Sequence, residues 1–466
     1  MKQTSLVKAL PFGFAAVGLI AFLLLWNGGS GRTLKPRMPG DDVTGDVASA
    51  TGTAAKWDGK LLKGPGTPPP NFTGVWPWFR GPTLNAVSTE AVPLATTWPP
   101  AGPPVLWKID VGEGFASPAL WNGRVLLTDY DHKNQADALR CLSLADGQEI
   151  WRYTYPCKVK RNHGMSRTIP AVTEKFTVSF GPRCNIVCVD TLTGELRWQL
   201  DLVREFHTEV PPWYAGQCPL LDGERLILAP GGDALVVALE LATGKILWKS
   251  PNPRAWQMTH SSLTPLDFKG RRMFVYCASG GVAGVAADDG SILWDTPDWK
   301  ISMANIPSPV PVGEGRLFLS GGYNAGSLMI QLAEAGGKFT VTNLFRLKPN
   351  VYGSAQQTPI LFQNHLFGVR PDGQLACLDL EGKTVWESGA AHKYGLGPFM
   401  IAGPLLFAMN DDGLLTLAEA STSAFKQLAQ AKVLAGPDAW GPMALADGRL
   451  ILRDMNQMIC LDVAAK

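Results

Sequence analysis

Eight residues whose side chains could bind a ligand share one place in this sequence of 466 residues, because each lies in or beside a small or polar segment that precedes an apolar strand. They are His163, Arg167, Trp213, Tyr214, His260, Asn305, Gln356 and Trp440. Trp213 and Tyr214 follow two prolines on an expected loop, where an aromatic pair could stack on a sugar or a peptide. The alternative is that these eight side chains pack loops or fill a channel.

The sequence motifs for a metal site or a catalytic site are weaker. His163 and His260 could bind a metal, but the six histidines are scattered without helical or strand-alternate partners, which is more typical of local hydrogen bonding. A nucleophile elbow, a phosphate loop and a Cys/His dyad are not visible. We therefore expect no catalytic residue and no metal site.

The elements that must position these residues come from a stronger repeat. Residues 188–198 read CVDTLTGELRW, and closely similar copies stand at 141–151, 238–248 and 284–294, with a shortened copy at 377–386. In all five copies a glycine stands four residues before a tryptophan. Glycine accepts the positive φ that a tight turn needs, so each copy predicts a β-hairpin whose second strand ends in an indole.

The spacing of the hairpins predicts the fold class. From Trp107 to Trp294 the motif tryptophans recur at intervals of roughly 44 to 50 residues, which is typical of propeller blades. Eight inner-strand openings and eight outer-strand ends can be counted. We therefore predict an all-β protein, an eight-bladed β-propeller of four-stranded antiparallel blades. Residues 419–434 could form a short helix on composition, but we interpret them as a strand pair.

The two ends of the repeat region complement each other. Residues 104–107 look like the second half of a hairpin without its first half, and residues 458–463 match a first half without its second. Pairing them would complete one blade and remove two exposed strand edges. We expect the N- and C-terminal strands to close the ring.

The N-terminus differs in composition from the rest. Residues 9–26 form an uncharged run of about 18 residues, just long enough to cross a bilayer. A cleaved signal peptide is the alternative. We predict a signal anchor or transmembrane helix at 1–26, a flexible Gly/Pro-rich linker at 27–71 and the propeller at 72–466. The expected place is the cytoplasmic membrane, single-pass, with the propeller on the periplasmic or other extracytoplasmic side.

Composition narrows the partners. Net charge is +2 and no Lys/Arg run stands out, which argues against nucleic acid. Four of the eight cysteines occupy one buried repeat position: Cys141, Cys188, Cys377 and Cys460. The other four lack C-x-x-C spacing, and a disulfide among them stays open if the domain is exported: Cys157, Cys184, Cys218 and Cys277.

The [Asp/Thr]-Gly-x-x-x-Trp repeats between residues 141 and 386 resemble the PQQ-like β-propeller repeat. That family includes quinoprotein dehydrogenases and the non-catalytic propeller lipoprotein of the bacterial outer-membrane barrel-assembly machinery. The opening WPWFRGP at 76–82, followed by Ser88, is similar to the start of exported PQQ-like propellers of planctomycete-type bacteria, and we place it on the rim of the ring. The resemblance implies that the motif tryptophans dock between blades: Trp107, Trp151, Trp198, Trp248, Trp294 and Trp386.

Three functions follow from the resemblance and the residues. The first is a monomeric, membrane-tethered and non-catalytic scaffold for interaction or assembly with other envelope proteins. The second is a quinone-dependent dehydrogenase with PQQ and calcium as cofactors, but the family's dehydrogenases typically carry adjacent cysteines and no Cys-Cys occurs here. The third is binding of a small molecule or glycan at the axial mouth through the eight residues named first. We favour the scaffold.

Overall fold

Each outer hairpin of the repeat turns at a glycine, where two physical constraints act. Gly194 and Gly244 both have a φ of 73°, in the left-handed region that glycine enters without steric strain. A Cβ atom on Gly194 would lie 2.6 Å from Cδ2 of Trp151, and one on Gly244 would lie 2.7 Å from Cδ2 of Trp198. The glycine therefore turns the chain and also leaves room for the indole of the preceding hairpin.

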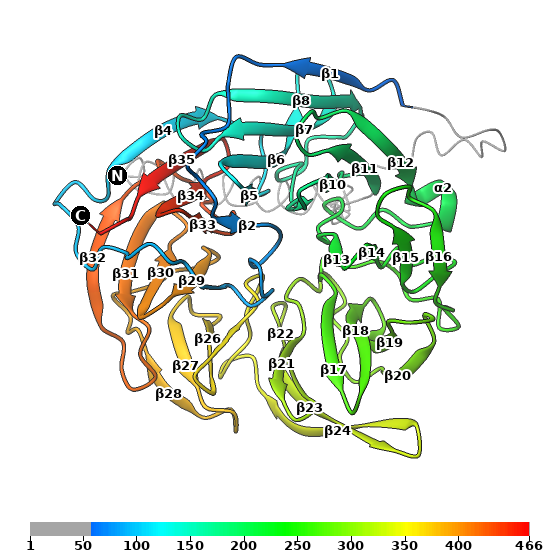
Figure 1. Cartoon of the computed structure of the whole chain (residues 1–466). Coiled ribbons are helices and arrows are strands. Elements are labelled where there is room, and N and C mark those ends of the chain that lie inside the picture. The colour runs from blue at the N-terminus through cyan, green and yellow to red at the C-terminus, as the bar shows by residue number, and fades with distance from the viewer. Residues whose placement is uncertain (1–56, 466) are drawn as a thin grey trace, which may run out of the picture. The chain divides into compact units, whose positions relative to one another are not determined.

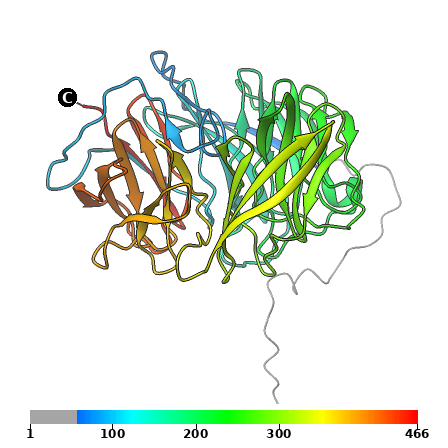
Figure 2. The same cartoon turned by 90° about the horizontal axis from the view of Figure 1, so that it is seen from below.

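The computed structural model describes residues 57–465, and these form eight sheets around one axis, each built on four antiparallel strands (Figure 1). We number the sheets as blades 1 to 8. Figure 2, a view at right angles, shows the strands running from one face of the ring toward the other. The predicted eight-bladed propeller of four-stranded blades is confirmed.

The first four blades follow one another along the chain. The four strands of each blade are given from the innermost to the outermost. Blade 1 has two further strands, which are described below. Blade 1 contains β5 (Ala119–Trp121), β6 (Arg124–Asp131), β7 (Ala136–Ser143) and β8 (Glu149–Pro156). Blade 2 contains β9 (Ala171–Val172), β10 (Phe176–Phe180), β11 (Asn185–Asp190) and β12 (Leu196–Asp201), followed by the short helix α2 (Leu202–Phe206). Blade 3 contains β13 (Leu220–Asp222), β14 (Arg225–Leu228), β15 (Val237–Glu240) and β16 (Ile246–Lys249). Blade 4 contains β17 (Thr264–Phe268), β18 (Arg271–Ala278), β19 (Gly281–Ala286) and β20 (Ile292–Thr296).

The last four blades complete the ring. Blade 5 contains β21 (Val310–Gly313), β22 (Arg316–Gly321), β23 (Gly326–Ala335) and β24 (Lys338–Leu347). Blade 6 contains β25 (Ile360–Phe362), β26 (His365–Val369), β27 (Leu375–Leu378) and β28 (Thr384–Glu387). Blade 7 contains β29 (Phe399–Ala402), β30 (Leu405–Met409), β31 (Leu414–Glu419) and β32 (Gln427–Lys432). Blade 8 contains β33 (Ala444–Ala446), β34 (Arg449–Arg453), β35 (Gln457–Asp462) and β4 (Val105–Asp110).

Blade 8 joins the two ends of the repeat region, as predicted. β4 pairs antiparallel with β35, with Trp107 opposite Cys460 and Ile109 opposite Met458. The strand pair expected within residues 419–434 is also confirmed, because β31 and β32 pair there. A β-bulge interrupts the outer hairpin of every blade at the same repeat position. The repeat is therefore regular in backbone geometry even where the motif residues are lost.

The motif tryptophans contact the neighbouring blade. Trp107 of blade 8 donates a hydrogen bond from Nε1 to the carbonyl of Leu144 in blade 1, at 2.9 Å, and Trp198 of blade 2 donates to Leu241 of blade 3 at 2.8 Å. Buried side chains of adjacent blades mix in the same way throughout the ring. The core of the propeller is thus a set of layers between blades.

The other four motif tryptophans vary this arrangement. Trp151 and Trp386 donate to carbonyls of the following blade, those of Thr191 and Ser421. Trp248 lies against Gly290 of the following blade, where a Cβ atom would come within 2.5 Å of its Cε3. Trp294 differs, because its Nε1 points at the sulfur of Met273 in its own blade, at 3.2 Å.

The cysteines behave as small hydrophobic residues. All eight are buried and none forms a disulfide. Burial raises the pKa of the Cys218 thiol to about 11, which keeps this thiol protonated at neutral pH. The disulfide left open among the second group of cysteines is not formed in this structure.

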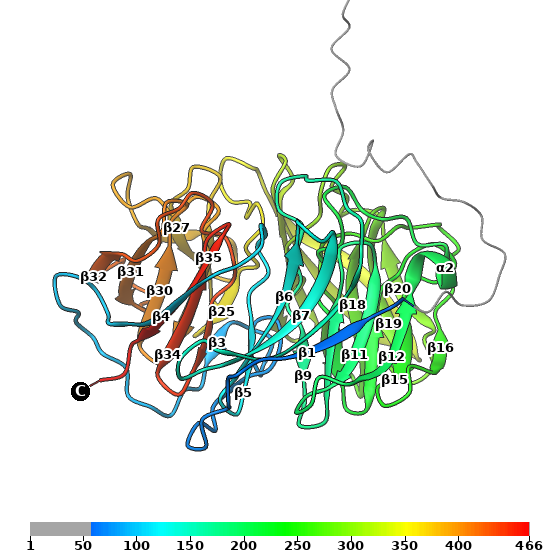
Figure 3. The same ribbon diagram turned by 90° about the horizontal axis from the view of Figure 1, so that it is seen from above.

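The N-terminal part of the expected linker is outside the described residues, and so is the predicted helix at 1–26. In the part of the chain that is described, no helix is both long and apolar enough to span a bilayer. Residues 57–71, expected to be linker, hold the strand β1 (Lys60–Lys63), which pairs antiparallel with β8 on the outside of blade 1 (Figure 3). Composition suggested a tether here, but the open edge of β8 supplies hydrogen-bond partners that a flexible linker would lack.

Residues 75–88, which we call the leader, lie at the axis and not on the rim as we had placed their opening segment. The leader begins with β2 (Val75–Trp76), which pairs with β5, and ends with β3 (Val87–Ser88), which pairs in parallel with β29. In Figure 1 the blue chain between β2 and β3 passes through the centre of the ring. The innermost strands of blades 1 and 7 each have an edge that faces the axis, and β2 and β3 pair with these two edges.

Candidate functional site

A cavity of about 160 Å³ lies at the axis of the ring. Its lining is mostly apolar with a few polar groups, which is typical of small-molecule sites. The lining residues are Trp76, Phe79, Arg80, Ala86, Phe115, Arg167, Ile169, Gly216, Cys218, His260, Ser262, Ile306, Gln356, Gln357, Thr358, Leu396, Pro398, Phe399, Met400, Trp440, Pro442 and Met443. We call it the axial cavity.

The two ends of the axial cavity are built from different parts of the chain. The leader pairs with Leu120 and Trp121, the last residues of β5, and with Ile401 and Ala402, the last residues of β29. Residues such as Arg167 instead precede the first residue of an inner strand. Because the inner strands all run in one direction along the axis, the leader forms the floor of the cavity, and the loops before the inner strands form its mouth.

Arg80 fastens the floor. Its guanidinium donates to four backbone carbonyls, two in its own loop and two in blade 6. The bonds to Thr358 and Pro359 measure 2.8 and 2.9 Å. These two carbonyls lie just before β25, across the axis from the start of the leader in blade 1. One side chain therefore ties the leader to the far side of the ring.

Arg167 brings a positive charge into the mouth. Its Nε donates to the carbonyl of Trp213 at 2.6 Å, and its Nη2 donates to the carbonyl of His163 at 2.6 Å. It forms no ion pair with any described residue, and Nη1 makes no hydrogen bond among them. Burial lowers the pKa of Arg167 to about 10, so the side chain remains charged at neutral pH. The charge of Arg167 also lowers the pKa of Tyr323 in blade 5, although burial raises it more.

His260 is one of two buried polar groups of the cavity without a partner among the described residues. It is 9% exposed, and its Nε2 makes no hydrogen bond within residues 57–465. Burial, and secondarily the charge of Arg167, lowers the pKa of His260 to about 4, while backbone carbonyls of Pro212 and Tyr214 act in the opposite direction. The imidazole is therefore neutral at pH 7. In the tautomer that carries its proton on Nδ1, toward these backbone carbonyls, Nε2 has a lone pair that can accept a hydrogen bond from a ligand.

Aromatic rings surround the mouth. Phe115 and Trp440 stack with centroids 5.0 Å apart, and the ring of His163 packs against both, at 5.6 and 5.4 Å. The Arg167 guanidinium lies 5.4 Å from the centroid of Phe115. Trp440 is held in place by a 2.7 Å hydrogen bond from Nε1 to Oδ1 of Asp411. The rings are thus preset before any ligand arrives.

Two adjacent glutamines complete the polar lining. Gln356 donates from Nε2 to the carbonyl of Leu396 at 3.1 Å. Gln357 donates from Nε2 to the carbonyls of Gly395 and Gly397, at 2.9 and 3.0 Å, which settles the orientation of its amide. Its Oε1 is buried without a partner. The cavity therefore holds a second acceptor that a ligand could use.

The eight residues singled out from the sequence divide into two groups. Arg167, His260, Gln356 and Trp440 line the axial cavity. The other four do not: His163 and Trp213 pack on its lining residues, Tyr214 pins a loop through hydrogen bonds of its hydroxyl with Lys160, and Asn305 is buried beside the lining residue Ile306.

Sequence reasoning missed several lining residues. Phe115 opens an inner strand as the eight do, so the same pattern could have found it. Trp76, Phe79 and Arg80 reach the cavity from the leader, and Gln357 stands next to a residue that was chosen. For the leader residues the repeat carries no signal, because the segment is not part of any blade motif.

The fold and the repeat can now be compared with known proteins. The PQQ_2 family model, described as outer membrane protein assembly factor BamB, matches residues 135–388, more than half of the chain. This chain belongs to that family of PQQ-like β-propellers. A comparison with curated proteins gave no match.

Solved structures of PQQ-like propellers and of one designed protein share this fold. BamB from Moraxella catarrhalis is 12% identical, with a TM-score of 0.51 over 77% of this chain and 99% of that chain. A europium-containing methanol dehydrogenase is 13% identical, with a TM-score of 0.57 over 81% and 89%. The computationally designed Ika8 protein is 11% identical, with a TM-score of 0.51 over 77% and 99%. At these identities the likeness shows the fold alone.

The axial cavity of this PQQ-like propeller can be tested against the quinone and calcium that the family resemblance implies. Calcium takes six to eight oxygen ligands, most of them carboxylates and carbonyls. No lining residue is an aspartate or glutamate, and the two charged lining residues are both arginines, Arg80 and Arg167. In the described part of the chain no three His, Cys, Asp or Glu side chains are placed to hold a metal ion. The donor set of the cavity does not fit a calcium-bound quinone.

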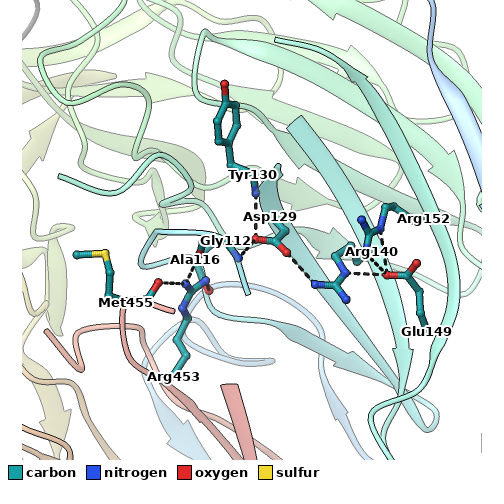
Figure 4. A network of polar contacts seen from close by, with 9 residues as sticks. All are labelled: Gly112, Ala116, Asp129, Tyr130, Arg140, Glu149, Arg152, Arg453 and Met455. Carbon is teal, nitrogen blue, oxygen red and sulfur yellow. Dashed lines mark hydrogen bonds and ion pairs between the residues drawn. The ribbon is translucent and has the colours of Figure 1, made fainter. Parts of the chain in front are cut away.

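A second cavity, of about 480 Å³, lies at the seam between blades 8 and 1. Three of its charged lining residues are paired within blade 1: Arg140 bonds to Asp129 and Glu149, both at 2.8 Å, and Arg152 bonds to the same Glu149 (Figure 4). Asp129 also accepts from the backbone N–H of Gly112. We interpret this seam network as structural.

Proposed function

We propose that this chain is a non-catalytic interaction or assembly scaffold of the bacterial envelope. In this proposal residues 1–26 anchor it in the cytoplasmic membrane, the segment that follows serves as a tether, and the propeller stands on the extracytoplasmic side. The uncharged run at 9–26 and the family description as an outer membrane protein assembly factor support this role.

The observation that carries the proposal is the closure of the axial channel by the leader. The dehydrogenase that the family resemblance implies would need room for its quinone cofactor and its substrate. Here two leader strands pair with inner strands, and Arg80 ties the leader across the ring. The remaining axial cavity is small and its donor set does not fit a calcium-bound quinone. Partner proteins would therefore bind the outer surface of the blades and not the axis.

Co-purification from membranes tests the scaffold role. The full-length chain, tagged at its C-terminus and crosslinked in intact cells, should recover the same few envelope proteins in repeated preparations. A matched control replaces residues 1–26 by a cleavable export signal, and this untethered propeller should recover them less efficiently. Recovery of no protein above the background of an unrelated anchored domain would contradict the proposal.

A second experiment addresses the dehydrogenase directly. The purified full-length chain is incubated with PQQ and Ca²⁺, and its thermal midpoint and dye-linked oxidation of primary alcohols are measured. We expect no shift and no oxidation. Quinone-dependent turnover would overturn the proposal in favour of an enzyme.

A further inference from the structure

We propose that the axial cavity binds a small aromatic carboxylate with a single ring and one further hydrogen-bond donor, of which the hydroxybenzoates are the simplest examples. This inference does not rest on the scaffold role, because a ligand at the axis and partners on the blades use different surfaces. Three features of the cavity lead to it: its size, its unbalanced charge and its unpartnered acceptors.

The size admits one ring. A cavity of about 150 Å³ in a protein core accommodates benzene. The axial cavity measures about 160 Å³ and is bounded by the rings of Phe79, Phe115 and Trp440. Offset or edge contacts with such rings favour an aromatic ligand over an aliphatic one of equal volume. A ligand with three fused rings would not fit without displacing the leader.

The positive charge of Arg167 favours an anionic ligand. Arg80 has its guanidinium engaged by four carbonyls. Arg167 lines the cavity and has no carboxylate partner among the described residues, and its Nη1 makes no hydrogen bond among them. A guanidinium in a partly buried site pairs strongly with a carboxylate through charge-assisted hydrogen bonds. Because no acidic residue lines the cavity, nothing competes with a ligand carboxylate there.

The two unpartnered acceptor atoms of the cavity favour a ligand that carries a hydrogen-bond donor. His260 Nε2 and Gln357 Oε1 are both buried, both without partners, and both belong to residues that line the cavity. An unpartnered buried acceptor is unfavourable, so a hydroxyl or amine on the ring would relieve it. Sites built to bond a substrate hydroxyl reject analogues that lack it. We therefore expect a hydroxybenzoate to bind better than benzoate.

The backbone holds the aromatic residues near the mouth in place. Trp213, Tyr214 and Tyr323 have φ values of 62°, 72° and 53°. Bulky residues rarely adopt these conformations, and where they do so the surrounding structure must hold them. Positive φ also occurs at other non-glycine residues of the described chain, so these values show only that the loops are held before any ligand arrives.

Isothermal titration of the full-length chain with 2-, 3- and 4-hydroxybenzoate tests the inference. At least one isomer should bind, about tenfold or more tightly than benzoate and than phenol, and acetate should give no heat of binding. Phenol lacks only the carboxylate and benzoate lacks only the hydroxyl, whereas acetate lacks both the ring and the hydroxyl. If no isomer binds, or if phenol binds as well as the best isomer, the proposal is overturned.

Variants localise the binding. Arg167→Met should weaken the best isomer by about tenfold or more, whereas Arg197→Met, on the outermost strand of the same blade, should leave affinity unchanged. Ile306→Trp fills the cavity without removing any bond of Arg167, and it should abolish binding. This second variant decides the matter if Arg167→Met fails to fold. Full affinity in a folded Ile306→Trp protein would place the ligand elsewhere and refute the axial site.

Discussion

A buried aspartate in blade 1 makes the stability of the propeller depend on pH in an unusual direction. Asp137 lies on β7 and is 1% exposed, and it accepts a 2.6 Å hydrogen bond from the hydroxyl of Tyr155. Burial raises the pKa of Asp137 to about 7, from 3.8 in an exposed chain, although the bond from Tyr155 acts in the opposite direction. The folded protein therefore prefers the protonated form.

The sign and size follow from linkage. Because the pKa is raised by folding, the stabilising contribution of Asp137 is complete below pH 3.8 and is lost as the pH rises to about 7. Integration of the two titrations predicts a loss of about 3 kcal/mol between pH 5 and pH 8. The amide side chain of an Asp137→Asn variant cannot ionise, so the variant lacks this slope. Relative to the wild type it should gain about 3 kcal/mol over that range.

Urea unfolding of both proteins at pH 5, 6, 7 and 8 measures the difference. Asp131→Asn is the matched control, because Asp131 lies in the same blade near the surface, and hydrogen bonds from Asn134 lower its pKa. It is ionised in both states over this range, so its substitution should shift stability equally at every pH. A flat difference for Asp137→Asn, or one in which the variant loses ground as pH rises, would refute the reasoning.

Three further perturbations address the ring itself. Gly194→Ala should lower the free energy of unfolding by about 2 kcal/mol or more, because φ is positive there and the added Cβ would meet Trp151. The control is Gly223→Ala, where φ is 61° and no atom lies within 4 Å of the added Cβ. Urea unfolding should show a loss of only about 1 kcal/mol for this control. Equal losses would contradict the packing argument. Deletion from Gln457 onward removes β35 and should leave no soluble monomer by size-exclusion chromatography, since both β34 and β4 lose their partner; a folded monomer would show that closure is dispensable. Arg80→Met should release the leader and make it the first site of limited proteolysis, and unchanged resistance would show that the strand pairs alone hold it.

Local sequence signals carried most of the fold. The glycine and tryptophan of each hairpin are four residues apart, so turn geometry and strand end are encoded within one short segment. The closure of the ring was also readable, because residues 458–463 and 104–107 are two halves of one motif. Four of the eight residues predicted at inner-strand openings line the axial cavity, because these openings lie near the axis, whereas the other four pack beside it.

The position of the leader, which forms the floor of the axial cavity, could not be predicted from the sequence. The leader carries no repeat motif, and its place at the axis depends on free inner edges of β5 and β29, which lie far apart in the sequence. The strand β1 likewise depends on the open edge of β8.

The sequence by itself determined a closed ring of eight blades, because each blade is specified by short-range turn chemistry repeated along the chain. Only the tertiary structure decided that the chain covers its own axis and leaves Arg167 and His260 around a small cavity. The physical reason is range: a hairpin is set by neighbours in sequence, whereas a charge without a counter-ion and an acceptor without a donor are properties of what distant loops bring together.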